Sequence, residues 1–180
     1  MKRYLLRKLA VRRNVTCDSS LHVGLGSVLW APTSLHIGRD VYLGKNVTLQ
    51  VDGSVGDGTM IANSVGIVGR SDHDIHAVGR TIRRAPWVGD VHSLSKQTKV
   101  GADVWIGYGA VVLSGVSIGD SAIVAAGSVV IHDIPANSIV AGNPARIIGE
   151  RFKNAELEEH WRALTAQGVT LTATTKGGAQ

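Results

Sequence analysis

A six-residue repeat is the feature of this sequence that most limits how the chain can fold. An aliphatic residue stands at every sixth position in two stretches, one from residue 37 to 67 and one from 100 to 130. A step of six residues moves about 120° around an α-helix of 3.6 residues per turn, so no single helix face could hold this set. The repeat therefore excludes amphipathic helices for both stretches. Its twelve members are Ile37, Leu43, Leu49, Val55, Ile61, Ile67, Val100, Ile106, Val112, Ile118, Val124 and Val130.

The residues that follow the repeated aliphatics indicate tight turns. Glycine comes next at positions 38, 44, 56, 101, 107 and 119, and alanine at 62 and 125. Such small residues suit points where a backbone turns sharply or packs closely. Each hexad therefore predicts a short strand and a turn, and three hexads make one coil of a parallel β-solenoid with the aliphatics inside. Weaker repeats at Val23-Gly24 and Leu29 extend the stack toward the N-terminus.

Positive charge is concentrated at the N-terminus, between Met1 and Arg13. This segment holds six of the 19 lysines and arginines and no acidic residue, while the remaining chain has 13 basic and 14 acidic residues. The body is therefore not a basic surface, and we predict no nucleic-acid partner. We expect residues 1–14 to form a basic cap in which Leu5, Leu6 and Leu9 lie on a short amphipathic helix. This helix covers the edge of the first coil or, as the alternative, makes a peripheral contact with an anionic membrane.

The sequence shows neither a membrane span nor a convincing secretion signal. No run approaches the roughly 18 apolar residues of a spanning helix. Basic residues interrupt every apolar run of the N-terminal segment, and no small-residue cleavage site follows it. Cys17 is the only cysteine, which excludes an intrachain disulfide and a cysteine zinc cluster and fits a reducing compartment. We therefore expect a cytoplasmic location.

Several motifs of the second half resemble those of the hexapeptide-repeat acyltransferases. The resemblance covers roughly residues 20–150. Within the family, the chain more narrowly resembles the maltose, galactoside and polysaccharide O-acetyltransferase branch. It implies an all-β fold, a left-handed parallel β-helix shaped as a triangular prism, and a homotrimer with active sites between subunits. The motifs are Val104-Trp105-Ile106-Gly107, Gly115-Val116-Ser117-Ile118-Gly119-Asp120, Ala126-Gly127-Ser128-Val129-Val130 and Ala141-Gly142-Asn143-Pro144-Ala145.

The chain is predicted to be one domain with a β-helix over residues 15–140 and a C-terminal segment over 141–180. Leu157, Trp161 and Leu164 have helical spacing, so we expect one short amphipathic helix between residues 154 and 167. Residues 170–180 are small and polar, and we predict that they are frayed.

One break in the repeat marks a protruding loop. The interval from Ile67 to Val100 is not a multiple of six, so we expect residues 69–98 to leave the prism. A loop of this length without a repeat of its own is usually functional. The resemblance implies that it carries the catalytic histidine.

By that resemblance, His73 is the general base. A neutral imidazole near pH 7 can take the proton of a sugar hydroxyl as the hydroxyl attacks a thioester. Asp72 and Asp74 are expected to orient the His73 ring, with solvated loop acids as the alternative. His76 is the rival base or a substrate contact. A metal site built from His73, His76 and His92 is the other use of these residues, but their spacing does not resemble that of zinc-dependent β-helix enzymes, and we predict no metal.

The loop also carries candidate acceptor contacts. Arg80, Arg83 and Arg84 form a basic cluster that could hold an anionic group, since guanidinium groups match phosphate and carboxylate geometry. Trp87 could stack on a sugar ring or anchor the loop. For each arginine, the alternative is a solvated loop position.

The resemblance places the acetyl-CoA groove on the C-terminal coils. Small residues there would let an extended pantetheine lie along the wall, or would only form tight corners: Gly107, Gly109, Ala125, Ala126 and Gly127. Trp105 is expected near the donor, with packing in the trimer as its alternative. Arg146 and Arg151 would meet the nucleotide phosphates. The segment Ala141, Gly142, Asn143 and Pro144 would line the groove.

The predicted reaction moves an acetyl group from acetyl-CoA to a hydroxyl of a sugar or polysaccharide precursor by direct, histidine-assisted attack. The alternatives are N-acetylation of an amino sugar and a non-catalytic β-helix interaction module. Relatives that acetylate free galactosides and maltose have an asparagine-rich stretch where this chain has Leu43-Gly44-Lys45-Asn46. Their acceptor contacts therefore do not carry over to this chain.

Overall fold

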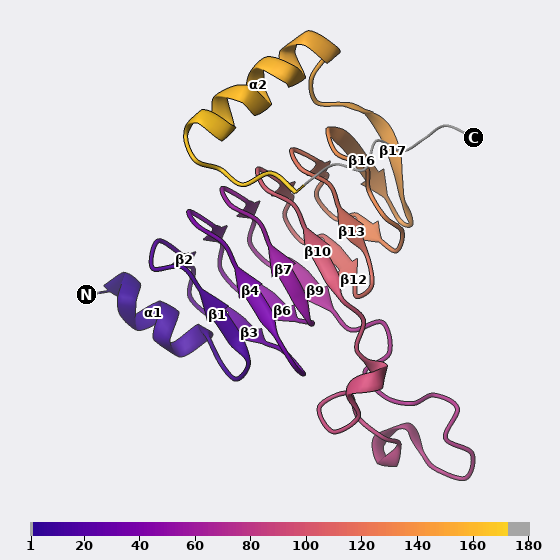
Figure 1. Cartoon of the computed structure of the whole chain (residues 1–180). Coiled ribbons are helices and arrows are strands. Elements are labelled where there is room, and N and C mark those ends of the chain that lie inside the picture. Colours follow the sequence, from indigo (N-terminus) through magenta and orange to yellow (C-terminus); the bar gives the residue numbers. More distant parts are fainter. Residues whose placement is uncertain (1, 173–180) are drawn as a thin grey trace.

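Short parallel strands stack into three sheets that form the walls of a triangular prism (Figure 1). The computed structural model describes residues 2–172. In each coil the chain passes from the first sheet to the second and then to the third, and each strand pairs in parallel with its counterpart in the next coil. The fold is the predicted left-handed parallel β-helix, with a loop projecting from it and a C-terminal helix.

The strands are two to six residues long. The first sheet contains β1 (Val15–Cys17), β4 (Leu35–Ile37), β7 (Gly53–Val55), β10 (Thr98–Val100) and β13 (Ser117–Ile118). The second contains β2 (His22–Val23), β5 (Tyr42–Leu43), β8 (Met60–Ile61), β11 (Trp105–Ile106), β14 (Ile123–Val124), β16 (Ser138–Gly142) and β17 (Ala145–Glu150), and β17 runs antiparallel to β16. The third contains β3 (Val28–Trp30), β6 (Thr48–Gln50), β9 (Gly66–Val68), β12 (Val111–Leu113) and β15 (Val129–Val130).

The repeated aliphatic residues fill the inside of the prism. All twelve are at most 3% exposed, which confirms the repeat as the core pattern. The residues four places after them, such as Val41, Val104 and Ala122, are buried as well. Because every coil presents the same inward positions, the core runs as one column through all the coils.

From the second coil on, the corners between the first and second sheets and between the second and third sheets are turned with a residue in the left-handed conformation. Glycine, asparagine and aspartate adopt this conformation at the least cost. Between the first and second sheets the backbone angle φ is positive at Asp40, Gly58, Asp103, Ser121 and Asn137. Between the second and third sheets it is positive at Gly26, Asn46, Ser64, Gly109 and Gly127.

Acidic side chains tie one coil to the next at the corners. The Oδ1 atom of Asp57 accepts the backbone N–H of Arg39 at 2.7 Å, and Oδ1 of Asp120 accepts that of Ala102 at 2.7 Å. In both pairs the donor lies one coil earlier. These bonds satisfy turn N–H groups that the sheet ladders do not reach.

Helices cover parts of the prism that the strands leave open (Figure 1). α1 (Lys2–Ala10) packs against β2 and β3 of the first coil. α2 (Asn154–Ala166) follows β17 and confirms the predicted C-terminal helix. Two short 3₁₀ turns, η1 (Ile82–Arg84) and η2 (His92–Leu94), lie in the loop. Within residues 2–172, no helix has the length and apolar character needed to cross a membrane.

The segment after α2 is ordered further than predicted. The backbone N–H of Thr170 donates to Asp57 Oδ2 at 3.2 Å, and the Thr172 hydroxyl donates to Asp120 Oδ1 at 2.8 Å. Residues 170–172 therefore rest on the corner between the first and second sheets instead of fraying. The rest of that prediction, for residues 173–180, lies outside the described residues.

Candidate active site

The protruding loop is an insertion between the third and fourth coils. Val111 of β12 pairs with Val129 in the following coil and with Gly66 in the preceding coil. Gly66 is much further from Val111 in the sequence than Val129 is, because the loop is inserted between Gly66 and Val111. The extra chain leaves after β9 and returns at β10 (Figure 1). Thr98, predicted as the last loop residue, is instead the buried first residue of β10.

His73 lies where the loop closes on itself. His73 and Trp87 form an isolated antiparallel bridge. On either side of it, the Asp74 N–H donates to the Pro86 carbonyl at 2.9 Å and the Val88 N–H donates to the Asp72 carbonyl at 2.8 Å. The residues between the two arms therefore form a closed excursion that begins and ends beside His73.

Trp87 fixes this closed excursion to the prism. Its ring stacks on Trp30 of β3, with ring centroids 5.4 Å apart and planes 7° from parallel. Gly89 lies against the same ring, so closely that a Cβ atom at residue 89 would come within 2.0 Å of it. Of the two predicted uses of Trp87, loop anchoring is the one that this contact provides. Sequence reasoning missed Trp30, because nothing in the repeat distinguishes it from other outward residues.

The carboxylates beside His73 are occupied elsewhere. Asp74 Oδ1 accepts the backbone N–H of His76 at 2.9 Å, and the Asp72 carboxylate lies against Gly69. Within residues 2–172, neither carboxylate hydrogen-bonds the His73 ring, which is half-buried. Asp72 and Asp74 are the sequence neighbours of His73, but within the described chain neither makes the predicted contact that would orient its ring.

The base of the loop is held by groups that the sequence did not single out. The Arg70 guanidinium donates to the Ile131 carbonyl at 2.7 Å, and its backbone N–H donates to Ser114 Oγ at 2.9 Å. On the returning arm, the Thr98 N–H donates to the Asp52 carbonyl at 2.8 Å. These bonds link the loop to the coils before and after it.

Three predicted substrate-binding arginines lie within the closed excursion. Arg80, Arg83 and Arg84 are exposed, and none makes a side-chain hydrogen bond or ion pair with another described residue. His76 is exposed on the same excursion. On the excursion that His73 closes, the loop therefore presents three guanidinium groups to solvent, together with exposed apolar side chains at Ile75, Val78 and Ile82.

The predicted donor residues gather on one corner of the prism. This corner joins the second and third sheets in successive coils: Gly107 and Gly109 belong to the coil of β11, Ala125, Ala126 and Gly127 to the next, and Ala141 and Gly142 to the last. Ala126, Gly127 and Gly142 are exposed. A side chain at Gly109 or Gly127 would meet nothing within 4 Å. The structure thus forms a strip of open backbone along this corner.

Gly107 shows why the strip needs small residues. A Cβ atom there would lie 2.6 Å from the Ala126 nitrogen and 2.9 Å from the Val124 carbonyl oxygen. Adjacent coils are therefore too close at this point for any side chain. The small residues of this corner therefore allow adjacent coils to pack closely and also leave the backbone accessible to a ligand.

The other predicted donor residues are less uniform in position. Asn143, Pro144 and Arg146 are exposed in the β16–β17 hairpin, at the end of the strip. Trp105 is half-exposed on the outer face of the second sheet, paired with Met60 on one side and Ile123 on the other. Trp105 and Arg146 both have free surface with which to contact a ligand.

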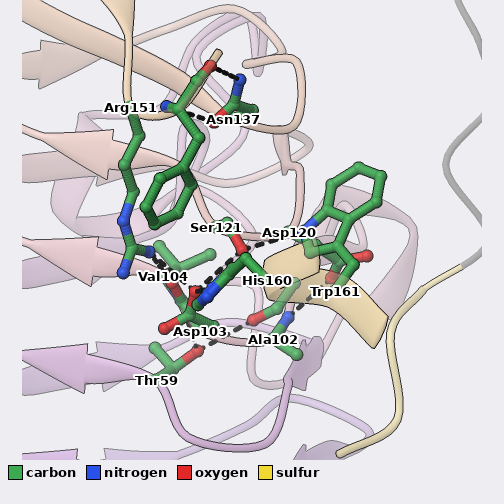
Figure 2. Close-up of polar contacts among 12 residues, drawn as sticks. Thr59, Ala102, Asp103, Val104, Asp120, Ser121, Asn137, Arg151, His160 and Trp161 are labelled. Atoms are coloured by element: carbon green, nitrogen blue, oxygen red, sulfur yellow. Dashed lines mark hydrogen bonds and ion pairs between the residues drawn. The ribbon is translucent and has the colours of Figure 1, made fainter. Parts of the chain in front are cut away.

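Arg151 contacts a different corner, where it holds α2 on the prism (Figure 2). Its guanidinium donates to Asp103 Oδ2 at 2.7 Å, and the same oxygen receives hydrogen bonds from His160 Nε2 at 2.8 Å and Ser121 Oγ at 2.8 Å. The Trp161 indole N–H then donates to Ser121 Oγ at 3.1 Å. Asp103 lies between the first and second sheets, so one chain does not bring Arg151 to the other predicted donor residues.

Cys17 takes no part in either cluster. It lies half-buried in β1, and burial raises the pKa of its thiol, with Asp18 adding to this effect and Arg7 opposing it. The thiol therefore stays protonated at neutral pH and is a poor nucleophile. Among residues 2–172, no three histidine, cysteine or acidic side chains are gathered as a metal site.

Within one chain the loop and the donor strip lie on opposite edges of the third sheet. The loop leaves from the end of β9, while the donor corner precedes the strands of the same sheet. A ligand that reached both His73 and Ala126 would have to cross the sheet or bind between two chains.

Comparison with known proteins identifies this architecture. A family model described as bacterial transferase hexapeptide (six repeats) matches residues 97–132, the stretch that includes β10 to β15. A crystal structure of a hexapeptide-repeat acetyltransferase from Vibrio cholerae, complexed with acetyl-CoA, superposes with a TM-score of 0.60 and 26% identity over 84% of this chain and 78% of that one. The chain has the fold of this hexapeptide-repeat acetyltransferase, and its residues 97–132 match the bacterial transferase hexapeptide family.

Sequence relatives of this hexapeptide-repeat protein differ in their acceptors. Galactoside O-acetyltransferase of Escherichia coli is 37% identical over 120 residues, which cover 66% of this chain and 55% of that enzyme. A 2,3,4,5-tetrahydropyridine-2,6-dicarboxylate N-acetyltransferase of Clostridium perfringens is 61% identical over 46 residues, 26% of this chain and 20% of that enzyme. The chain therefore spans about half the length of the first relative and a fifth of the second.

Proposed function

We propose that this protein transfers an acetyl group from acetyl-CoA to a hydroxyl of a sugar or polysaccharide precursor. The observation that carries the proposal is the strip of open backbone at Gly109, Ala126, Gly127 and Gly142, which spans three successive coils. Similarity to an acetyl-CoA-bound structure and to a galactoside O-acetyltransferase supports the choice of donor and acceptor. The lone cysteine fits a reducing compartment, and we place the reaction in the cytoplasm.

The chain's own residues would act as follows. Acetyl-CoA supplies an acetyl group already activated as a thioester, so no covalent nucleophile is needed. His73 would accept the proton of the acceptor hydroxyl as the new C–O bond forms and the C–S bond breaks, and would then pass that proton to the departing sulfur. The Ala126 N–H donates no hydrogen bond within residues 2–172 and is available to stabilise the oxygen that becomes negative.

The donor strip can be tested by filling it. Ala126→Trp places a large ring at an exposed position of the donor corner. Lys45→Trp is the matched control, because Lys45 is the exposed middle residue of the same corner in the second coil. Isothermal titration should show acetyl-CoA binding weakened at least about tenfold by Ala126→Trp and unchanged by Lys45→Trp. Absence of acetyl-CoA binding to the wild type at millimolar ligand would favour a non-catalytic module instead.

We also propose that the active form is a homotrimer with sites between chains. The position of the loop and the donor strip on opposite edges of the third sheet supports this, as do the exposed Ile75, Val78 and Ile82 of the loop. Mixing His73→Ala chains with Ala126→Trp chains should restore activity that each variant lacks alone, because some mixed sites would pair an intact loop with an intact strip. A monomer by light scattering, or no recovery on mixing, would contradict the assembly.

The acceptor is proposed to carry a negative charge. Arg80, Arg83 and Arg84 are free of protein partners within the described residues and lie on the excursion that His73 closes. Guanidinium groups in such a cluster suit a phosphate or carboxylate. Because one relative is an N-acetyltransferase, an amine acceptor is the second candidate. Comparing hydroxyl and amine acceptors by the release of CoA thiol separates the two.

A further inference from the structure

The N-terminal helix has one covered side and one apolar side in solvent. Ala10 is buried and Leu6 is half-buried, on the side of α1 that packs against the first coil. Leu5 and Leu9 stand one turn apart on another face and are 55% and 65% exposed. Tyr4 beside them is 61% exposed. Covering the end of the prism therefore uses only one side of this helix.

Basic residues lie close to the exposed leucines in the sequence. Lys8, Arg12 and Arg13 are exposed, while Arg7 is turned back to the prism and donates to the Asp18 and Ser19 carbonyls. The sequence up to Arg13 holds six basic and no acidic side chains, whereas the rest of the chain is close to neutral. The apolar face of α1 thus lies in the one strongly positive region of the sequence.

We propose that α1 binds the surface of an anionic lipid bilayer, with Leu5, Leu9 and Tyr4 inserted among the headgroups and Lys8, Arg12 and Arg13 facing them. An interfacial helix combines an exposed apolar face with nearby basic residues in this way. Tyrosine is favoured at the membrane–water interface because its ring is apolar and its hydroxyl is polar. The helix lies on the bilayer and does not cross it.

Charge favours an anionic bilayer over a second copy of the chain as the partner of α1. Two α1 helices brought together would place like charges side by side, which is unfavourable. An anionic bilayer attracts the same residues and also accepts the leucines. A nucleic acid would satisfy the charges but would leave Leu5 and Leu9 without a partner.

The helix and the loop approach the first coil through different residues. α1 packs on β2 and β3, whereas the loop leaves from β9 in the third coil and reaches back to the end of β3 by stacking Trp87 on Trp30. Strands in adjacent coils are about 4.8 Å apart, so the base of the loop stands roughly 10 Å from the first coil. The donor strip begins one coil further away.

Vesicle flotation with the full chain tests the proposal. The probes are vesicles of phosphatidylcholine alone and vesicles containing about one-third phosphatidylglycerol. The wild type should bind the anionic vesicles at least about tenfold more tightly than the neutral ones, and salt should weaken the binding. Equal binding to both vesicles, or none to either, would overturn the proposal; retention by an acidic protein instead would point to a protein partner.

Variants separate the two contributions. Leu5→Gln with Leu9→Gln should weaken binding to anionic vesicles about tenfold or more, because the apolar insertion is lost. Leu25→Gln is the matched control: Leu25 is 65% exposed on the first coil but outside α1, and its replacement should change nothing. Replacing Lys8, Arg12 and Arg13 with glutamine should weaken binding by roughly 100-fold at low salt, about fivefold for each charge. Leucine variants that bind like the wild type would contradict insertion.

Folding and catalysis serve as independent readouts. All six substituted side chains are exposed, so the thermal midpoint should stay near that of the wild type. Acetyl transfer to a water-soluble acceptor should also be unchanged without vesicles. Because vesicle binding needs no turnover, the membrane proposal can fail while the acetyltransferase proposal stands, and the reverse.

Discussion

Asp103→Asn should loosen the attachment of α2 to the prism. The Oδ2 atom of Asp103 accepts hydrogen bonds from the side chains of Arg151, His160 and Ser121 (Figure 2). Asparagine has the same size and also tolerates the left-handed backbone that this corner needs, with φ of 54°. The substitution therefore removes the negative charge and leaves the local shape.

The magnitude follows from how far this ion pair is shielded from water. The Asp103 and Arg151 side chains are 23% and 25% exposed. A fully exposed pair contributes about 0 to 1 kcal/mol, and removing one partner of a fully buried pair costs about 3 to 5 kcal/mol. We therefore expect a loss of about 2 kcal/mol, which for a chain of this length lowers the thermal midpoint by roughly 4 to 8 °C.

Urea unfolding followed by circular dichroism measures this loss. Asp40→Asn is the matched control, because Asp40 turns the same corner in the second coil with φ of 51°, is exposed, and makes no ion pair with a described residue. It should cost less than about 0.5 kcal/mol. If the two asparagine variants had equal stability, the reasoning from the Asp103 cluster would be refuted.

Three further predictions concern catalysis, acid stability and coil packing. His73→Ala should lower kcat by roughly 10² to 10⁴ with acetyl-CoA affinity nearly unchanged, and His76→Ala should do much less; a His73→Ala enzyme with more than about a third of wild-type kcat would move the assignment to His76. Burial opposes ionisation of Asp57, but hydrogen bonds from Arg39 outweigh it and hold the pKa of that carboxyl below 3.8. Its stabilisation is thus present above pH 3.8 and lost at lower pH, so melting curves of Asp57→Asn and wild type should differ at pH 7 and converge in acid, and a constant difference would contradict this. Gly107→Ala should destabilise the protein by about 1 to 3 kcal/mol in urea unfolding, because its Cβ would meet backbone of the next coil; a neutral result would refute the close approach.

The core and the corners were predictable because the repeat encodes them locally. Every hexad carries its own inward aliphatic residue, so each coil could be recognised without knowing the others. The left-handed corner positions could have been found in the same way, since Gly109, Asp103 and Asn137 are residue types that favour that conformation. The handedness of the coil entered only through the family resemblance.

The loop could be located but not folded from the sequence. Its closure depends on Trp87 stacking on Trp30, two residues that are distant in the chain and whose contact the repeat does not predict. Arg151 was predicted to meet a nucleotide phosphate because arginine suits anions. The structure shows that the nearest anion is Asp103 of the protein itself, a contact that depends on how β17 and α2 fold back over the prism.

Acceptor-dependent release of CoA thiol from acetyl-CoA tests the central claim most directly. The purified full chain would be incubated with acetyl-CoA and a panel of neutral sugars, anionic sugars and amino sugars, with His73→Ala as the inactive comparison. The account predicts that a hydroxyl acceptor stimulates thiol release by the wild type and that His73→Ala reduces the rate by at least about 100-fold. Release with amine acceptors alone, or an equal rate with and without His73, would contradict it.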